Sequence, residues 1–216
     1  MAEQGRKGQA RRNDTVILEA AREVFLDDPK APIAAVADRA GVGISALYRR
    51  YAGKEDLLRT LCHDGLKRFI QEAEDAGRAH EDGWVALRAF LEGVVDADVH
   101  SLTVHLAGTF SPTEEMHADA VASNGLVEGL VKRAHGSGRL RRDFTVADVG
   151  LVLEACAAIR LPDRDRTAQL RRRYLGLTLD GMDRTDAGAL PGPAPVPGEF
   201  NYRWRRSPSE TPRESR

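Results

Sequence analysis

The chain has only two cysteines, which excludes a disulfide-rich or zinc-binding protein. It also has no long apolar run, which excludes a membrane-spanning helix. Its two cysteines, Cys62 and Cys156, fit neither a disulfide framework nor a zinc site in number or spacing. No run of about 18 apolar residues occurs, and the N-terminus lacks the apolar stretch of a signal peptide. We therefore expect a cytoplasmic protein that does not interact with membranes.

Sequence signatures of catalysis and metal binding are also missing. There is no glycine-rich phosphate loop and no Gly-x-Ser-x-Gly turn, and the adjacent Cys62 and His63 would point apart on a helix. His100 and His105 are five residues apart, which a straight helix places on different faces. No set of Cys, His and carboxylate side chains completes a metal site. We expect no enzymatic activity, no metal and no other cofactor.

A strong net charge is absent as well. The net charge of −1 excludes a globally basic binder of nucleic acids, but the first twelve residues carry Arg6, Lys7, Arg11 and Arg12 against Glu3. Local positive charge at a contact face is what phosphate binding requires. We expect residues 1–12 to form a flexible basic arm.

What the chain does have is helical periodicity. Apolar residues recur at spacings of three and four, and no strand-like alternation rises above noise. The predicted fold class is therefore all-α. Helices are expected from about Asp14, from Pro32, from Lys54 to about Gly77, from Gly83, around 101–110, from Ser111 to about His135, over 145–159 and over about 166–182.

Residues 186–216 differ in character from the rest. Four of the ten prolines fall between Ala187 and Gly198, and the final residues are charged and polar. This composition predicts an irregular or disordered tail. Phe200, Tyr202 and Trp204 are unusual in such a tail and could dock on the body or on a partner subunit, or be incidental.

The most informative segment is 36–51, which reads as two short helices separated at Gly41. Gly41 can adopt the positive φ that a tight turn between helices needs, and Ala37 is small where the helix backbones approach. The expected shared buried face consists of Val36, Ala40, Val42 and Leu47. Such a pair, crossing at a steep angle, is a helix-turn-helix, whose second helix enters the DNA major groove.

Leu47–Tyr51 followed by Lys54–Leu58 resembles the recognition-helix signature of TetR/AcrR-type regulators, and Ile17–Phe25 resembles the first helix of that family. The resemblance covers roughly residues 13–62 and becomes only architectural beyond residue 70. Gly43 departs from the Ser or Thr that often caps the recognition helix in this family. Ala31 and Pro32 stand where Thr often opens the second helix.

The resemblance implies two units. A three-helix helix-turn-helix head for DNA binding is expected over 13–55, with the motif at about 32–51 and the family-type domain extending to about 69. A helical regulatory and dimerisation domain is expected over 56–185. The helix that begins at Lys54 would connect the two units through its apolar stripe.

Candidate DNA-binding residues surround the recognition helix. Ser45 and Ala46 lie in its first turn, nearest the base edges, where Ser45 could donate a hydrogen bond and Ala46 could meet a thymine methyl. Arg49 and Arg50 could donate to guanine or phosphate, or be a solvated pair.

The remaining candidates would contact the DNA backbone. The resemblance makes Tyr48 a phosphate contact, with a purely structural tyrosine as the alternative. Lys54 lies at a helix N-terminus that favours a phosphate, with an ordinary surface lysine as the alternative. Arg11 and Arg12 could reach towards the minor groove, although a disordered arm is an equal alternative.

One helix-turn-helix makes few contacts, so useful affinity needs two, about one helical turn of DNA apart. The resemblance implies that the last two helices of each subunit form a four-helix dimer interface. The candidate interface residues are Val149, Val152, Leu153, Leu170, Tyr174 and Leu177. The alternative is that these faces serve only the core of the monomer. Arg171, Arg172 and Arg173 could rim the interface or form an ordinary solvated face.

The central helices would then enclose a ligand pocket with apolar walls and a few polar groups. Its candidate lining is Trp84, Phe90, Leu102, His105, Phe110, Met116, His117 and Cys156, with Leu91, His100 and Val121 as further members. Each residue could instead be simple core. The predicted function is a dimeric, sequence-specific repressor released from operator DNA by a small molecule. The alternative is a ligand-independent regulator or a nucleoid-type DNA binder.

Overall fold

The computed structural model describes residues 2–183, 186, 188–196 and 198–199, with side chains from residue 14 onward. Among these residues the regular structure is helical, without strands, which confirms the predicted all-α class. The helices are α1 (Ala2–Asp27), α2 (Ile33–Ala40), α3 (Ile44–Tyr48), α4 (Lys54–Ala79), α5 (Gly83–Asp96), α6 (Val99–Leu106), α7 (Glu114–Gly136), α8 (Val146–Ala158) and α9 (Arg164–Met182).

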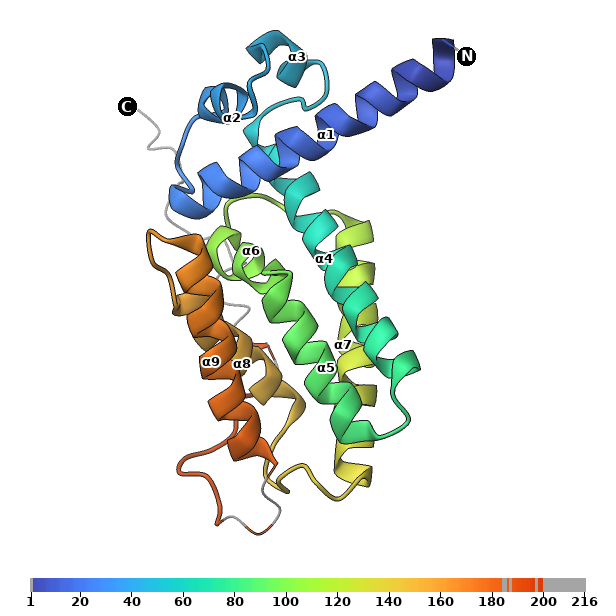
Figure 1. The fold of residues 1–216 in the computed structure, drawn as a ribbon, viewed down its shortest axis with the longest axis vertical. Helices are drawn as coiled ribbons and strands as arrows, with labels where there is room; N and C mark the ends of the chain where they lie inside the picture. The colour runs from blue at the N-terminus through green and yellow to red at the C-terminus, as the bar shows by residue number, and fades with distance from the viewer. Residues whose placement is uncertain (1, 184–185, 187, 197, 200–216) are drawn as a thin grey trace, which may run out of the picture.

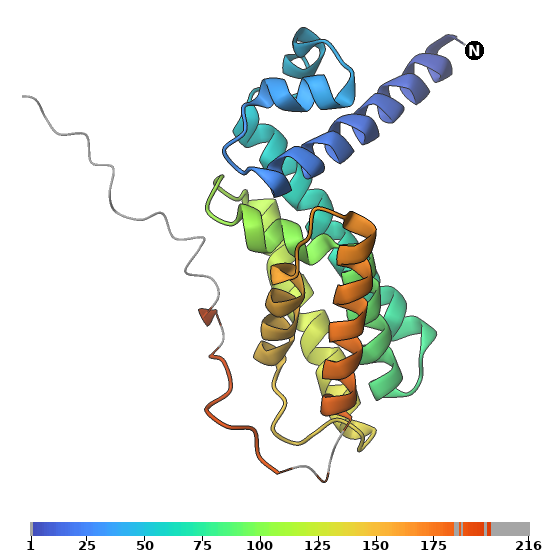
Figure 2. The ribbon, with the colours of Figure 1, turned by 60° about the vertical axis from the view of Figure 1, so that its left-hand side comes forward.

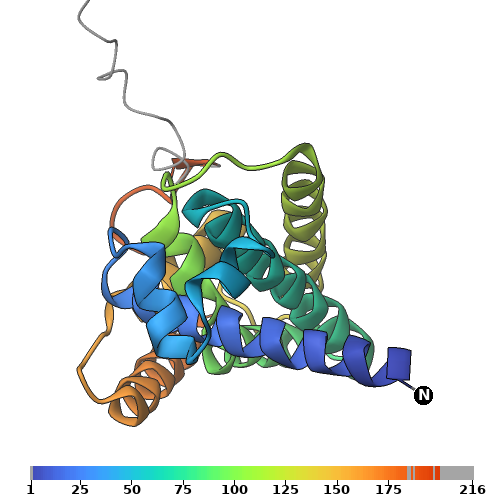
Figure 3. The same ribbon diagram turned by 90° about the horizontal axis from the view of Figure 1, so that it is seen from above.

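The helices form a small head on an elongated body (Figure 1). The head comprises α1, α2, α3 and the first turns of α4, and α4 continues from it down into the body. In the turned view, α8 and α9 lie together along one side of the body (Figure 2). Seen from above, α7 and α9 lie on opposite sides (Figure 3). The α8–α9 pair is therefore an outer layer of the body.

The backbone of α1 is helical from Ala2, which differs from the flexible arm expected over residues 1–12. Its C-terminal half packs through Ile17, Ala21 and Phe25, which are almost completely buried. Extending an existing helix adds one hydrogen bond per residue and needs no new nucleus. The packed half of α1 can therefore support the polar turns that precede it.

Two hydrophobic cores are stacked along α4. The upper core lies between the head and the top of the body and the lower core fills the body, and α4 contributes to both. The upper core contains Ile17, Ala20, Ala21, Phe25, Ala31, Ile33, Val36, Ala37, Leu47, Tyr51, Leu57, Leu58, Leu61, Cys62, Leu102, Leu106, Phe110 and Met116. The lower core is built mainly from α5, α7, α8 and α9, with Ala73 and Ala76 from α4.

Side chains cap the first turns of α5, α7 and α9. The Asp82 carboxylate accepts the N–H of Val85 at 2.9 Å at the start of α5. The Thr113 hydroxyl accepts the N–H of Met116 at 3.2 Å at the start of α7. Each cap satisfies a backbone donor that the first turn of a helix leaves unpaired.

The residues that follow α9 form hydrogen bonds with the loop that precedes α8. The Arg141 guanidinium donates to the Gly188 carbonyl at 2.9 Å, and the N–H of Leu190 donates to the Asp143 carboxylate at 2.7 Å. Residues 188–196 contain no helix or strand. Phe200, Tyr202 and Trp204 lie outside the described residues. None of the helices in the described part of the chain is long and apolar enough to cross a membrane.

Gly83 marks a very close approach between α5 and α7. A Cβ atom at this position would lie 2.1 Å from the carbonyl oxygen of Arg133, which is backbone and cannot move aside easily. We expect Gly83→Ala to lower the free energy of unfolding by about 1–3 kcal/mol, the usual cost of overpacking. Urea unfolding measures this change.

Gly129→Ala on α7 is the matched control, because a Cβ at that exposed position meets nothing within 4 Å. Alanine favours a helix over glycine, so this variant should be as stable as the parent chain or more stable by up to about 1 kcal/mol. Equal effects of the two substitutions would contradict the close approach.

Candidate DNA-binding surface and regulatory cleft

The turn between α2 and α3 has the predicted geometry. Gly41 adopts φ 64° and ψ 31°, and its N–H and that of Val42 bond to carbonyls of the last turn of α2. A Cβ at Gly41 would meet nothing, so the requirement for glycine comes from the left-handed backbone. Val36 and Leu47 are fully buried, whereas Ala40 and Val42 are half-buried at the edge of the upper core.

The outer surface of α3 presents polar side chains to solvent. Ser45, Tyr48 and Arg49 are exposed, with Tyr48 at 53%, and their side chains have no hydrogen bond or ion pair within the described residues. Ala46 is half-buried beside them. Arg49 follows the last residue of the five-residue α3. This surface therefore offers unengaged donors on a short helix held from behind by Leu47.

Arg50, in contrast, turns towards α1. Its guanidinium donates to the Asp14 carboxylate at 2.7 Å and forms an ion pair with it. Asp14 is predicted as the N-cap of the first helix, but α1 begins at Ala2 and leaves Asp14 in mid-helix, available to Arg50. The pair joins the end of the recognition segment to α1.

Lys54 is also engaged within the head. Its Nζ donates to the carbonyl of Ala31 at 2.7 Å and lies 5.2 Å from the centre of the Phe25 ring. Burial lowers the pKa of this lysine. Lys54 therefore braces the first turn of α4 against the α1–α2 connection. The side chains of Arg11 and Arg12 lie outside the described part of the structure, although their backbone belongs to α1.

The predicted ligand-pocket residues do not gather in one cavity. Trp84, Phe90 and Cys156 are packed in the lower core. Leu102, Phe110 and Met116 belong to the upper core. His117 and Val121 are exposed on α7, so the prediction of a common lining is wrong for them. The apolar periodicity that suggested pocket walls reflects two separate packed cores.

A cavity of about 420 Å³ lies instead at the boundary between head and body, and we call it the head–body cleft. Its walls come from α1, α2, the α5–α6 junction, the α8–α9 connection and α9. His105 is the member of the predicted pocket that lines it. The lining is Arg22, Glu23, Val24, Leu26, Asp27, Arg39, Val95, Asp96, Asp98, Ser101, His105, Arg160, Leu161, Pro162, Arg164, Thr167, Ala168 and Arg171.

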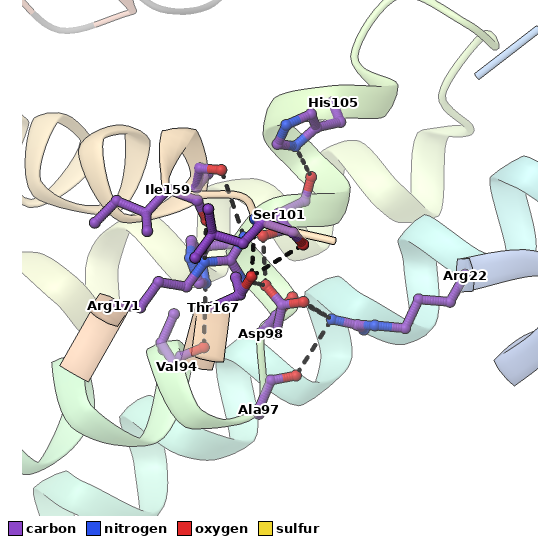
Figure 4. A network of polar contacts seen from close by, with 12 residues as sticks. Arg22, Val94, Ala97, Asp98, Ser101, His105, Ile159, Thr167 and Arg171 are labelled. Carbon is purple, nitrogen blue, oxygen red and sulfur yellow. Dashed lines mark hydrogen bonds and ion pairs between the residues drawn. The ribbon is translucent and has the colours of Figure 1, made fainter. Parts of the chain in front are cut away.

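The Asp98 carboxylate organises the inner wall of this cleft (Figure 4). It forms ion pairs with Arg22 of α1, at 3.0 Å, and with Arg171 of α9, and it accepts the Ser101 hydroxyl. Burial alone would raise the pKa of Asp98, but the Ser101 hydrogen bond and the charges of Arg22 and Arg171 hold it below its ordinary value. Three separate helices thus meet at one carboxylate.

Arg171 differs from both expectations for the arginine run, an interface rim or a solvated face. Its side chain is buried, and its Nε donates to the carbonyl of Ile159 at 3.0 Å while the guanidinium pairs with Asp98. Arg172 and Arg173 are exposed, as expected. The burial of Arg171 depends on the tertiary position of Asp98, which lies 73 residues earlier in the chain.

The predicted dimer-interface residues divide into two groups. Val149, Val152 and Leu153 are buried in the lower core of their own subunit, so their assignment to a partner-facing surface is wrong. Leu170 is half-buried, Tyr174 is exposed and Leu177 is 65% exposed. The outward residues of α8 are Ala147, Leu151, Ala155 and Ala158, which are exposed or half-buried.

The described residues also bring together His63 of α4 with Glu115 and Asp119 of α7, whose ligand atoms lie within 4.8 Å of one another. The sequence alone does not indicate this set, because its members lie far apart along the chain. His63 Nε2 is 2.8 Å from the Asp119 carboxylate, and Lys67 lies 3.7 Å from Glu115. These pairs hold α4 against the start of α7.

Comparisons with known proteins identify the class to which this architecture belongs. Residues 17–61 match the model of the bacterial regulatory proteins of the tetR family, and residues 83–184 match the C-terminal domain of SbtR-like transcriptional regulators. The chain belongs to the TetR family of transcriptional regulators. Members of this family are regulators and not enzymes, in agreement with the sequence analysis.

Individual relatives are similar over different spans. The HTH-type transcriptional repressor LfrR of Mycolicibacterium smegmatis is 35% identical over 92 residues, which are 41% of this chain and 47% of that protein. The match thus spans about half the length of that relative. The LfrR structure with proflavine has a TM-score of 0.55 and 26% identity, covering 76% of this chain and 95% of that chain. A TetR regulator from Streptomyces coelicolor has a TM-score of 0.56 and 23% identity, covering 79% and 98%.

Removing the charge of Asp98 should destabilise the protein. Asp98 has φ 52°, a conformation that asparagine tolerates, so Asp98→Asn keeps the backbone and leaves the buried Arg171 without its countercharge. We expect the free energy of unfolding at pH 7 to fall by about 1–3 kcal/mol. Urea unfolding of both proteins measures the difference.

The pH dependence provides a second readout. Because the folded pKa of Asp98 is lowered, its stabilisation is complete above the ordinary aspartate pKa and is lost as the pH falls through the lowered value. The difference between parent and variant should therefore shrink in acid. Asp96→Asn, which breaks an exposed pair with Arg172, is the control and should change stability little. A similar loss in both variants would contradict the central role of Asp98.

Proposed function

We propose that the protein is a dimeric transcriptional repressor that binds operator DNA through α3 and is released when a small molecule binds. The observation that supports this proposal most directly is the helix-turn-helix. On its outer face, Ser45, Tyr48 and Arg49 are exposed and make no hydrogen bond or ion pair within the described residues. The similarity to LfrR, which is a transcriptional repressor, supports repression and not activation.

Each exposed residue of the recognition segment has a distinct proposed role. Ser45 and Ala46, in the first turn of α3, face base edges in the major groove. Tyr48 positions the head by donating its hydroxyl to a phosphate. Arg49, with no intramolecular partner in the described residues, is the arginine free to read guanine. Arg50 and Lys54 act through the geometry of the head, because both are bound to other parts of it.

Two variants distinguish residues that recognise bases from residues that position the head on the DNA backbone. Arg49→Ala should cost about 1–3 kcal/mol of operator affinity and relax specificity at a defined base pair. Tyr48→Phe should weaken operator and unrelated DNA by a similar factor, because phosphate contacts carry no sequence information. Fluorescence anisotropy on operator and scrambled duplexes measures both.

Arg142→Ala, an exposed arginine in the loop before α8, is the control for the lost charge. It should leave both affinities unchanged. Operator binding by Arg49→Ala and Tyr48→Phe at the parental level would remove α3 from the interface.

The proposed dimer forms through the outer faces of α8 and α9. On α9, Leu170, Tyr174 and Leu177 follow one another at spacings of four and three, which places them in one stripe. On α8, Leu151 stands among small alanines that would let a partner helix approach closely. Burying these faces in a four-helix bundle would explain why large apolar side chains are exposed on this outer layer.

A charge in the α9 stripe tests the interface. Leu177→Arg would place an unpaired charge in the proposed bundle, so we expect monomers at concentrations where the parent chain is dimeric. The substitution is at a position 65% exposed in the subunit, so the subunit itself should still fold. Sedimentation velocity reports the assembly state and circular dichroism the fold.

Val121→Arg is the matched control, since Val121 is 72% exposed but lies on α7, on the opposite side of the body from α9. It should remain dimeric. An operator-binding dimer of Leu177→Arg would place the interface elsewhere.

Binding of a small molecule is supported by the structure of LfrR in complex with proflavine. In this chain the head–body cleft is a cavity of ordinary ligand-site size that touches the head and the α8–α9 layer at once. A ligand bound there with higher affinity in a splayed dimer would separate the two recognition helices and prevent both from fitting successive major grooves. By linkage, operator DNA would weaken the ligand by the same factor.

A further inference from the structure

The arginines of the head–body cleft outnumber the carboxylates that neutralise them. Glu23 of α1 pairs with both Arg39 and Arg164. The Asp98 carboxylate is shared in the same way by Arg22 and Arg171. Two carboxylates therefore serve four guanidinium groups, which leaves an excess of positive charge along these walls.

Arg160 adds a fifth positive charge to this lining. It lies just beyond the end of α8, is exposed, and has no hydrogen bond or ion pair within the described residues. Its charge is felt across the cleft at His105 on α6. Burial is the main cause of the lowered pKa of His105, and the positive charges of Arg160 and Arg171 lower it further. The cleft thus has an exposed guanidinium that makes no hydrogen bond or ion pair within the described residues.

The acidic residues of the lining restrict where an anion could lie. Asp96 pairs with Arg172, outside the lining, and is thereby neutralised. Asp27 is exposed at the end of α1 and would repel an anionic group from that wall. The wall formed by Arg160 is therefore the favoured place for a negative charge.

Apolar side chains follow Arg160 directly. Leu161, which is 44% exposed, and Pro162 continue the same wall, and Val24, Leu26 and Val95 line the cleft from α1 and α5. An exposed leucine next to a free arginine suits a ligand with a charged head and an apolar body.

We propose that the head–body cleft binds an amphipathic organic anion, with its carboxylate or phosphate head on Arg160 and its apolar body against Leu161 and Pro162. This inference rests on the proposed ligand-responsive function and gives that ligand a chemical class and a place. The cleft is separate from the packed interior around Trp84 and Phe90.

Such an anion would act on the contacts that hold the head to the body. Arg164 of α9 bridges to Glu23 of α1, and Arg22 of α1 bridges to Asp98 at the start of α6. An anionic head beside Arg160 competes with these carboxylates for the neighbouring guanidinium groups. Loosening either bridge weakens the polar contacts that help to orient α1, and with it the helix-turn-helix, on the body.

Isothermal titration calorimetry on the full chain, without DNA, tests the site. The probes are decanoate, decyl phosphate and decanol, which share a ten-carbon chain and differ in the head. At least one of the two anions should bind ten times more tightly than decanol, and the stronger one identifies the head group. Equal binding of all three would overturn the proposal.

Arg160→Ala should weaken the preferred anion at least tenfold, whereas Arg142→Ala removes an exposed arginine outside the cleft and should leave binding unchanged. Thermal unfolding should show that Arg160→Ala is folded, because this exposed side chain makes no hydrogen bond or ion pair within the described residues. Unchanged anion binding in folded Arg160→Ala would overturn the site.

Operator binding measured in the presence of the preferred anion tests the anion site and the proposed release from DNA independently. Release of operator by the anion, with about tenfold more required for Arg160→Ala, supports both. Arg160-dependent binding that leaves operator affinity unchanged supports the site and overturns release by this ligand class.

Discussion

The structure depends on a single shared carboxylate. Asp98 adopts a left-handed backbone conformation between α5 and α6 and there receives Arg22 from the head and Arg171 from the outer helix layer. A buried guanidinium without such a partner would be strongly unfavourable, so α9 can pack on the body only where Asp98 meets it. The same carboxylate fixes the end of α1. The orientation of the head and the position of the proposed dimer helices are therefore coupled through one carboxylate.

The parts of this molecule that sequence predicts well are those decided by local physics. The left-handed turn at Gly41, the cap at Asp82 and the burial of Leu47 each follow from the conformational or hydrophobic preferences of a few neighbouring residues. The two helices and the turn of the helix-turn-helix follow from signals that are consecutive along the chain. The helices of the body are likewise found from their periodicity and their start signals.

The parts that sequence does not predict depend on partners distant in the chain. Arg50 looks like a free DNA-reading residue until the extended α1 brings Asp14 to it. Val149 and Leu177 are equally apolar in the sequence, yet one is in the core and the other on the surface. Helical spacing identifies an apolar face, but it does not say whether that face meets its own subunit, a partner or a ligand.

The upper core has a consequence for how such regulators can be recombined. Leu102 and Leu106 of α6 and Met116 of α7 pack with the helices of the head, so the predicted boundary between residues 55 and 56 cuts through one hydrophobic core. A head excised there would expose the apolar side of α1, which packs against α4 and α6, to water. The reading head is thus not a portable module. A chimaera that exchanges DNA specificity should carry α6 and the start of α7 together with the head.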